Sequence, residues 1–283
     1  MGEKEYDDFF KKSLSEMEEV CNKHLEKEEL DIDKWGEDLF KIDSLKELNE
    51  YLESEENLKK CEPFEKLRQK YISLHDRYND SFDDLYKGIE EKTCRREYSR
   101  GGICMHRGFY SPSQLDLVVR GVNRGRLLKR GKNGNESFEY LFDNENELIC
   151  VYSFYDRPDL FLPSIELFVK NNDVVQSFQF NRTPGRKGLQ YITEVIKEDG
   201  KIMEYRWAMF NIFTEDRIEF NMLQVEKYCY KDDRIQSFHY YEYRPDPKRP
   251  FLRHDKFTLF WDENGKIQSV NTEYYPNLDV QKK

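Results

Sequence analysis

The feature that most constrains this fold is a change in the spacing of apolar residues near residue 95. Before it, apolar residues recur every three or four positions, which is the period of a helix with one buried face. After it they alternate with polar residues and are interrupted by short polar turns, which is typical of antiparallel strands joined by hairpins. The sequence therefore predicts an N-terminal helical region followed by a β-meander.

The helical region is expected to span residues 1–92. A first stripe runs from Tyr6 to Leu25, and Ser44 with Glu47 has the spacing of a capping box that begins a second helix. Pro63 suits the first turn of a third helix, and Ser81 begins a fourth. We expect these helices to pack on each other or on the sheet.

The meander is expected over residues 135–283, because polar turns recur there with the Asn, Asp or Gly that tolerates left-handed backbone angles. Those turns are centred on residues 145, 172, 199, 216, 232 and 264. Between them, the predicted strands are 136–143, 147–156, 164–170, 173–180, 189–197, 201–213, 217–230, 234–244, 255–262 and 266–275.

Ten consecutive strands without helices between them leave little room for the crossovers that parallel pairs need. The predicted fold class is therefore α+β, with an up-and-down antiparallel meander of about ten strands. Several strands are apolar on both faces, so one face should receive the helices and the other a barrel interior or a second sheet. An open sheet, a half-barrel and a barrel remain alternatives.

Charge divides the chain into three parts. Residues 1–92 hold 16 basic and 28 acidic residues, whereas residues 93–132 hold ten basic and two acidic ones. The basic stretch lies in the predicted connecting segment, 93–134. It would either dock on the acidic residues 1–92 or bind a polyanion such as nucleic acid. The net charge of −10 counts against nucleic acid.

The predicted hairpins repeat a pattern of aromatic or aliphatic residues, a polar turn and then an aliphatic residue. That residue is Leu148, Val174, Ile202, Ile235 or Ile267. The last hairpin, LFWDENGKIQSV at 259–270, resembles the tyrosine-aspartate repeats of Rhs-type bacterial proteins, and the set resembles hairpin repeats of toxin-immunity proteins. The resemblance covers about half the chain, and most units lack the turn glycine.

No motif for a nucleotide, cofactor or metal is present, and the six cysteines are too scattered for a disulfide framework. Cys104 and His106 would share one face of a strand, which leaves a thiolate site near arginines as one alternative to free thiols. Residues 1–10 lack the features of a secretory signal, and no apolar run is long enough to span a bilayer. We therefore expect a cytoplasmic protein that is not an enzyme.

Tyrosine and tryptophan anchor protein interfaces, and acidic surfaces speed the capture of basic partners. The leading hypothesis is therefore a protein-binding module, such as an immunity-type inhibitor of a basic toxin domain. The alternatives are a calycin-like barrel for a small apolar ligand and a polyanion-binding protein that uses residues 95–132. The candidate binding residues are Arg120, Arg124, Arg126, Arg182, Arg186, Tyr205, Trp207, Tyr240, Tyr243 and Trp261.

Overall fold

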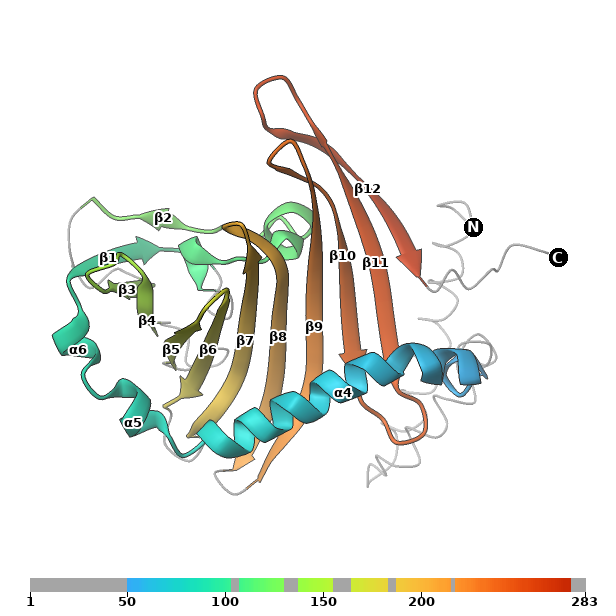
Figure 1. The fold of residues 1–283 in the computed structure, drawn as a ribbon, viewed down its shortest axis with the longest axis horizontal. Coiled ribbons are helices and arrows are strands. Elements are labelled where there is room, and N and C mark those ends of the chain that lie inside the picture. The colour runs from blue at the N-terminus through green and yellow to red at the C-terminus, as the bar shows by residue number, and fades with distance from the viewer. Residues whose placement is uncertain are drawn as a thin grey trace, which may run out of the picture.

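One antiparallel sheet organises the described part of the chain, and helices lie across one of its faces (Figure 1). The computed structural model describes residues 50–102, 107–129, 137–154, 164–182, 187–214 and 217–275. Within them the sheet has 12 strands in the order β12-β11-β10-β9-β8-β7-β6-β5-β4-β3-β1-β2 and does not close. The predicted α+β meander is confirmed, and the described residues form an open sheet rather than a closed barrel.

The predicted strands correspond to β3–β12. The largest difference is at β11, which begins four residues earlier than predicted. The bounds are β3 (Phe138–Phe142), β4 (Leu148–Ser153), β5 (Ser164–Asn171), β6 (Val174–Asn181), β7 (Gly188–Glu198), β8 (Lys201–Thr214), β9 (Arg217–Lys231), β10 (Arg234–Arg244), β11 (Phe251–Trp261) and β12 (Ile267–Tyr275). The basic segment adds β1 (Arg95–Arg100), which pairs with β3, and β2 (Arg126–Leu127), which pairs with β1.

The hairpin turns form where the sequence places residues that tolerate a positive φ. Asn172, Asp199 and Asp232 have φ values of 51°, 50° and 50°, and Gly265 has a φ of 74°. Asn and Asp are the non-glycine residues that reach this region at least cost. The turn chemistry therefore fixes the hairpins, which explains why strand positions were predictable.

Helix α4 (Glu55–Tyr78) crosses the sheet diagonally, and the short helices α5 (Phe82–Tyr86) and α6 (Ile89–Lys92) follow it (Figure 1). Ser54 caps α4 by accepting a hydrogen bond from the Asn57 amide at 3.2 Å. Pro63 lies inside this helix rather than in the first turn of a separate one, which corrects the predicted boundary. The helices predicted near Tyr6–Leu25 and Ser44 begin outside the described residues.

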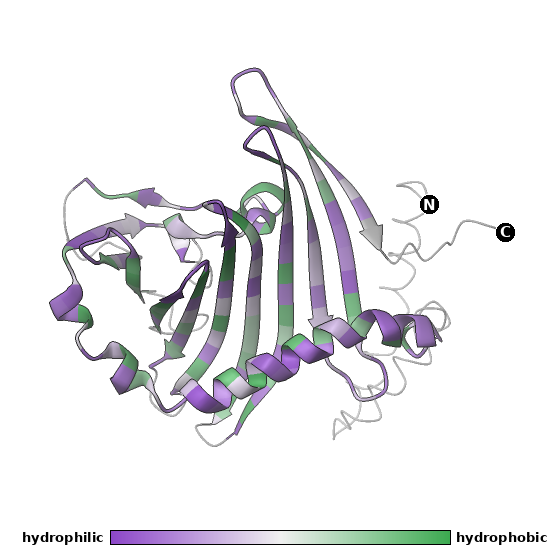
Figure 2. Cartoon of the chain, viewed as in Figure 1, coloured by the Kyte–Doolittle hydropathy of each residue, from purple (hydrophilic) through white to green (hydrophobic). Residues whose placement is uncertain are grey.

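The face under α4 carries the larger apolar core. Phe178, Ile192 and Leu223 are fully buried there, and Phe64, Leu67 and other apolar residues of α4 pack against this cluster. Each such side chain contributes about 1.5–3 kcal/mol by leaving water. The alternation of apolar and polar bands along the strands is visible in Figure 2. This confirms the expectation that one face receives the N-terminal helices.

The opposite face is covered by residues 107–120, which we call the strap (green in Figure 1). Leu115 and Val118 of the strap pack on an aromatic cluster that includes Phe238 and Phe257. Phe109 and Tyr110 pack on a second cluster around Tyr140. Within the described residues, this face is therefore covered by a connecting segment, rather than by a barrel interior or a second sheet.

Polar groups hold the strap on the sheet. The Glu226 carboxylate accepts hydrogen bonds from the backbone amides of Gln114 and Leu115 at 2.8 and 2.9 Å. It thereby satisfies free amide donors at the start of the single π-helical turn, Leu115–Val119. Hydrogen bonds from Ser113, the Leu115 amide and Tyr228 stabilise the charged form of Glu226. The effect of burial is larger, so the pKa of Glu226 is raised.

Candidate functional site

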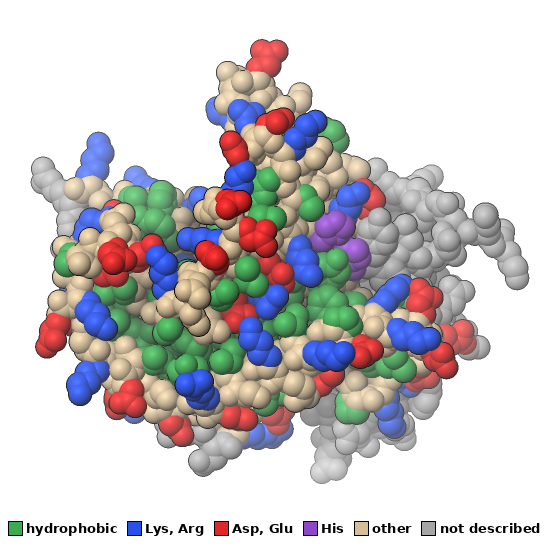
Figure 3. All heavy atoms as spheres, viewed as in Figure 1, with side chains coloured by type: hydrophobic (Ala, Val, Ile, Leu, Met, Phe, Trp, Pro, Cys, Tyr) green, Lys and Arg blue, Asp and Glu red, His purple; other side chains and the backbone are tan. Residues whose placement is uncertain are grey.

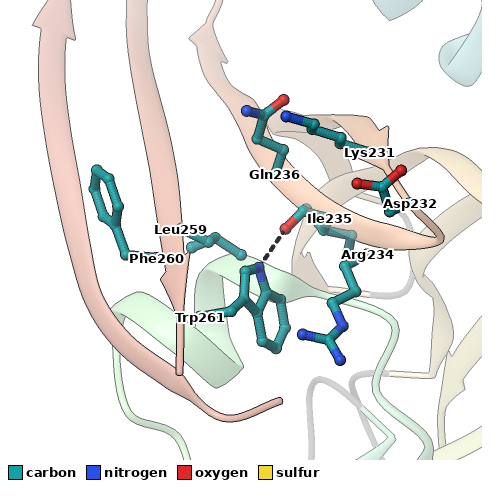
Figure 4. A pocket seen from close by; sticks show the side chains of 8 residues that line it. All are labelled: Lys231, Asp232, Arg234, Ile235, Gln236, Leu259, Phe260 and Trp261. Carbon is teal, nitrogen blue, oxygen red and sulfur yellow. Dashed lines mark hydrogen bonds between the residues drawn. The ribbon is translucent and has the colours of Figure 1, made fainter. Parts of the chain in front are cut away.

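A pocket opens at one end of the sheet, beside the turns that join β9 to β10 and β11 to β12 (Figure 4). Its volume is about 470 Å³, and Ile235, Leu259, Phe260 and Trp261 supply its apolar lining. Trp261 is fixed by a hydrogen bond of 2.9 Å from its indole N–H to the Ile235 carbonyl. Figure 4 shows this bond inside the pocket.

The rim of this pocket is charged. Lys231, Asp232 and Arg234 line it together with the apolar side chains, and the Arg234 guanidinium lies 5.9 Å from the centre of the Trp261 ring. Phe260 is 49% exposed, so its ring is available to a partner beside the pocket. The pocket can therefore accommodate an apolar side chain next to cationic groups.

Strand β12 forms one edge of the sheet and lies next to this pocket. Among the described strands it pairs with β11 alone, with seven regular pairs from His254–Tyr275 to Phe260–Ser269. Its sequence contains no proline or glycine. Its one charged residue, Glu273, accepts from Lys256 on β11 at 2.8 Å. The edge therefore lacks the prolines and free charges that commonly block pairing with another chain.

The predicted aromatic binding residues separate into two groups. Tyr205, Trp207, Tyr240 and Tyr243 are all buried within the chain, each less than 5% exposed. Tyr243 holds α4 by donating to the Glu65 carboxylate at 2.7 Å. These four side chains therefore build the two cores instead of presenting a surface, and Trp261 is the one placed in the pocket.

The predicted arginines lie in separate places. Arg120 pairs with Asp116 at 3.0 Å, with its guanidinium 6.0 Å from the Tyr240 ring centre. Arg182 lies 4.0 Å above the Phe82 ring. Arg124 and Arg126 are exposed at the opposite end of the sheet from β12, on and beside β2. Arg186, Cys104 and His106 lie outside the described residues.

Sequence reasoning missed two arrangements that depend on long-range pairing. Arg107 is buried on the sheet between residues of β5, β6 and β7, which no sequence motif indicates. His239 and His254 meet on adjacent strands of the face that carries α4, where histidines form a visible patch (Figure 3). Alternation along each strand would place them on one face, but their contact depends on the β10–β11 register.

The histidine pair is held in a mainly neutral state. His239 Nδ1 and His254 Nε2 lie 2.9 Å apart, and the His254 ring stacks on Tyr241 with 4.3 Å between ring centres. Burial lowers the pKa of His254 to about 4, together with repulsion from His239 when that ring is protonated and from Lys60. Burial and the Lys256 charge likewise lower the pKa of His239.

This pair predicts acid sensitivity. In the unfolded chain a histidine binds its proton near pH 6.5, whereas folded His254 does so near pH 4. A lowered histidine pKa means that stability is lost as pH falls from about 6.5 towards 4. We expect the free energy of unfolding to fall by about 1 kcal/mol between pH 7 and 5, after allowing for solvent screening of this partly exposed pair.

Urea denaturation at several pH values would measure this loss. His254→Phe keeps a ring to stack on Tyr241 but cannot be protonated. Its free energy of unfolding should therefore lose only a small part of the expected amount of about 1 kcal/mol between pH 7 and 5. An unchanged pH profile in this variant would contradict the prediction.

The described residues lack two further features that would indicate a function. No three His, Cys, Asp or Glu side chains in this part of the chain are grouped as metal ligands. None of the helices described is both long and apolar enough to cross a membrane. Comparisons with protein-family models, curated proteins and solved structures gave no match to this chain.

Proposed function

We propose that this chain is a protein-binding module that takes a strand of its partner along the free edge of β12. The observation that carries the proposal is that edge: nine residues pair on one side only within the described sheet and lack the common protective features. In strand addition, main-chain hydrogen bonds supply affinity and adjacent pockets supply specificity. An open edge of this kind suits that mode of binding.

The pocket beside β12 supports the same proposal. Phe260 lies opposite Ser269 of β12, so an exposed aromatic side chain borders the proposed docking strand. A partner strand paired with β12 would place its side chains near Phe260, and a residue beyond that strand could enter the pocket. Buried aromatic anchors of this kind supply much of the energy of protein interfaces.

The partner proposed here is a basic protein, such as the toxin domain countered by an immunity protein. The acidic excess of residues 1–92 and the likeness of the hairpins to toxin-immunity repeats support this choice. Association with a basic partner would be accelerated by charge and slowed by added salt.

Substitutions on the exposed face of β12 test the proposal. Ser269→Lys with Asn271→Lys adds two charges at exposed positions, so the fold should remain intact while strand addition is repelled. We expect at least a tenfold loss of the partner captured from the source cell at low salt, roughly 1.4 kcal/mol or more. Quantitative mass spectrometry of pull-downs would measure the loss.

The matched control adds the same two charges on α4, as Gln69→Lys with Ser73→Lys, both exposed and remote from β12. It should capture the partner as the unmodified chain does. Equal capture by both variants would refute the β12 edge as the docking strand. Light scattering adds a second test: a wild-type dimer that the β12 substitutions dissociate would identify the occupant as another copy of this chain.

A further inference from the structure

The two-stranded ribbon of β1 and β2 places like charges directly opposite each other. Arg100 pairs with Arg126 in the register of this ribbon, and both side chains are exposed. Directly opposed residues of an antiparallel pair have Cβ atoms about 5 Å apart, and like charges there destabilise the pair. The free protein therefore bears a local electrostatic cost at this position.

The cost is not offset by carboxylates in the described part of the chain. Arg100, Arg124, Arg126 and Lys129 make no ion pair with any described acidic residue, although most other strand arginines do. The acidic residues near the ribbon already have partners. Glu97 binds Arg95 and Tyr110, and Glu139 binds Arg96 and Tyr98.

Arg124 adds a third cation to this corner of the molecule. Although its side chain is exposed, the protein atoms around the guanidinium partly desolvate it and lower its pKa, and no carboxylate of the described residues opposes that effect. The backbone around it is closely packed: a Cβ added to Gly125 would lie 2.6 Å from the Arg100 carbonyl oxygen. Gly125 has a φ of 77°, and its amide donates to the Asn123 side chain at 2.8 Å. The turn before β2 is therefore fixed, and it holds its arginines next to Arg100.

We infer that the β1–β2 ribbon binds the phosphate backbone of a nucleic-acid strand through Arg100, Arg124, Arg126 and Lys129. An anion bridging Arg100 and Arg126 would turn their repulsion into two attractions. Arginine presents a rigid fork that matches phosphate oxygens, and three of the four cations are arginines. Four cations within one ribbon and its turn match a chain of phosphates better than a single anion.

This site is independent of the proposed docking edge, since β2 and β12 lie at opposite ends of the sheet order. The chain as a whole carries a charge of −10, so long-range attraction to nucleic acid is weak and binding must come from local contacts. We therefore expect modest affinity with a clear dependence on salt.

Fluorescence anisotropy with a labelled single-stranded oligonucleotide tests the inference. Four phosphate contacts give a slope of about −2.8 for the logarithm of affinity against that of salt concentration, or a weakening of about 50-fold from 50 to 200 mM. Arg100→Gln with Arg126→Gln should halve the slope to about −1.4. Lys59→Gln with Lys66→Gln removes two exposed charges from α4 and should leave the slope unchanged.

Two further measurements separate this site from its alternatives. Removing one of two opposed arginines should raise the melting temperature by about 1–3 °C, whereas loss of a merely structural contact would lower it. Competition with polyglutamate and with inorganic polyphosphate identifies the ligand class. The inference is overturned by an absence of oligonucleotide binding at 50 mM salt, by an unchanged slope in the double variant, or by stronger competition from polyglutamate than from an unlabelled oligonucleotide.

Discussion

Replacing Arg107 with alanine is expected to lower the free energy of unfolding by about 3–5 kcal/mol, the usual cost of removing one partner from a buried ion pair. The Arg107 Nε lies 2.6 Å from the Glu166 carboxylate, and both side chains are at most 7% exposed. The same guanidinium donates to the Ser177 and Thr193 hydroxyls. Without it, Glu166 would keep a buried charge with no opposite charge beside it.

Urea denaturation followed by circular dichroism would measure this loss. Arg217→Ala serves as the control, because Arg217 and Glu219 form an exposed pair that should contribute less than about 1 kcal/mol. Arg107→Met combined with Glu166→Leu removes both charges and should recover most of the stability. A loss below about 1 kcal/mol in Arg107→Ala, near the value for exposed pairs, would show that the buried pair does not anchor the strap.

The hairpins were predictable because their information is local. Asn172, Asp199 and Asp232 occupy left-handed positions in the structure, and alternation between such turns fixes where each strand runs. The change from a helical period to alternation located the boundary between helices and sheet in the same way. Local rules suffice wherever consecutive strands pair with each other.

The candidate sites were less predictable because they depend on contacts distant in sequence. Trp207 and Tyr240 were expected at a surface, but the strap and the sheet bury them. Nothing in the strap sequence indicates that it crosses the sheet, since Arg107 reaches partners 59 to 86 residues away. The pairing of Arg100 with Arg126 likewise depends on the register between β1 and β2. No short turn sets that register, because the strap separates the two strands in the sequence.

A second polar network, under α4, carries the next-largest predicted effect. Glu194 on β7 is buried and lies 2.6 Å from Lys70, 2.8 Å from the Tyr71 hydroxyl and 2.7 Å from Gln176. Arg206 on β8 contacts the same carboxylate at 3.2 Å. Burial acts to raise the pKa of Glu194, but the hydrogen bonds from Lys70 and Gln176 outweigh it and lower the pKa. Folding therefore favours the charged form of this residue.

Glu194→Ala should lower the free energy of unfolding by about 3 kcal/mol, at the low end for a buried pair because Arg206 keeps its bond to Glu204. The fully buried Tyr71 hydroxyl would lose its acceptor, so Tyr71→Phe in the Glu194→Ala background should cost about 1 kcal/mol less than in the wild type. Urea denaturation of the unmodified chain, the two single variants and the double variant gives both values. Glu147→Ala serves as the control, because Glu147 forms an exposed pair with Lys170.

Hydrogen exchange adds a readout by position: amides of α4 should lose more protection than those of β10 and β11. Equal losses in both regions would mean that Glu194 stabilises the sheet as a whole rather than the docking of α4.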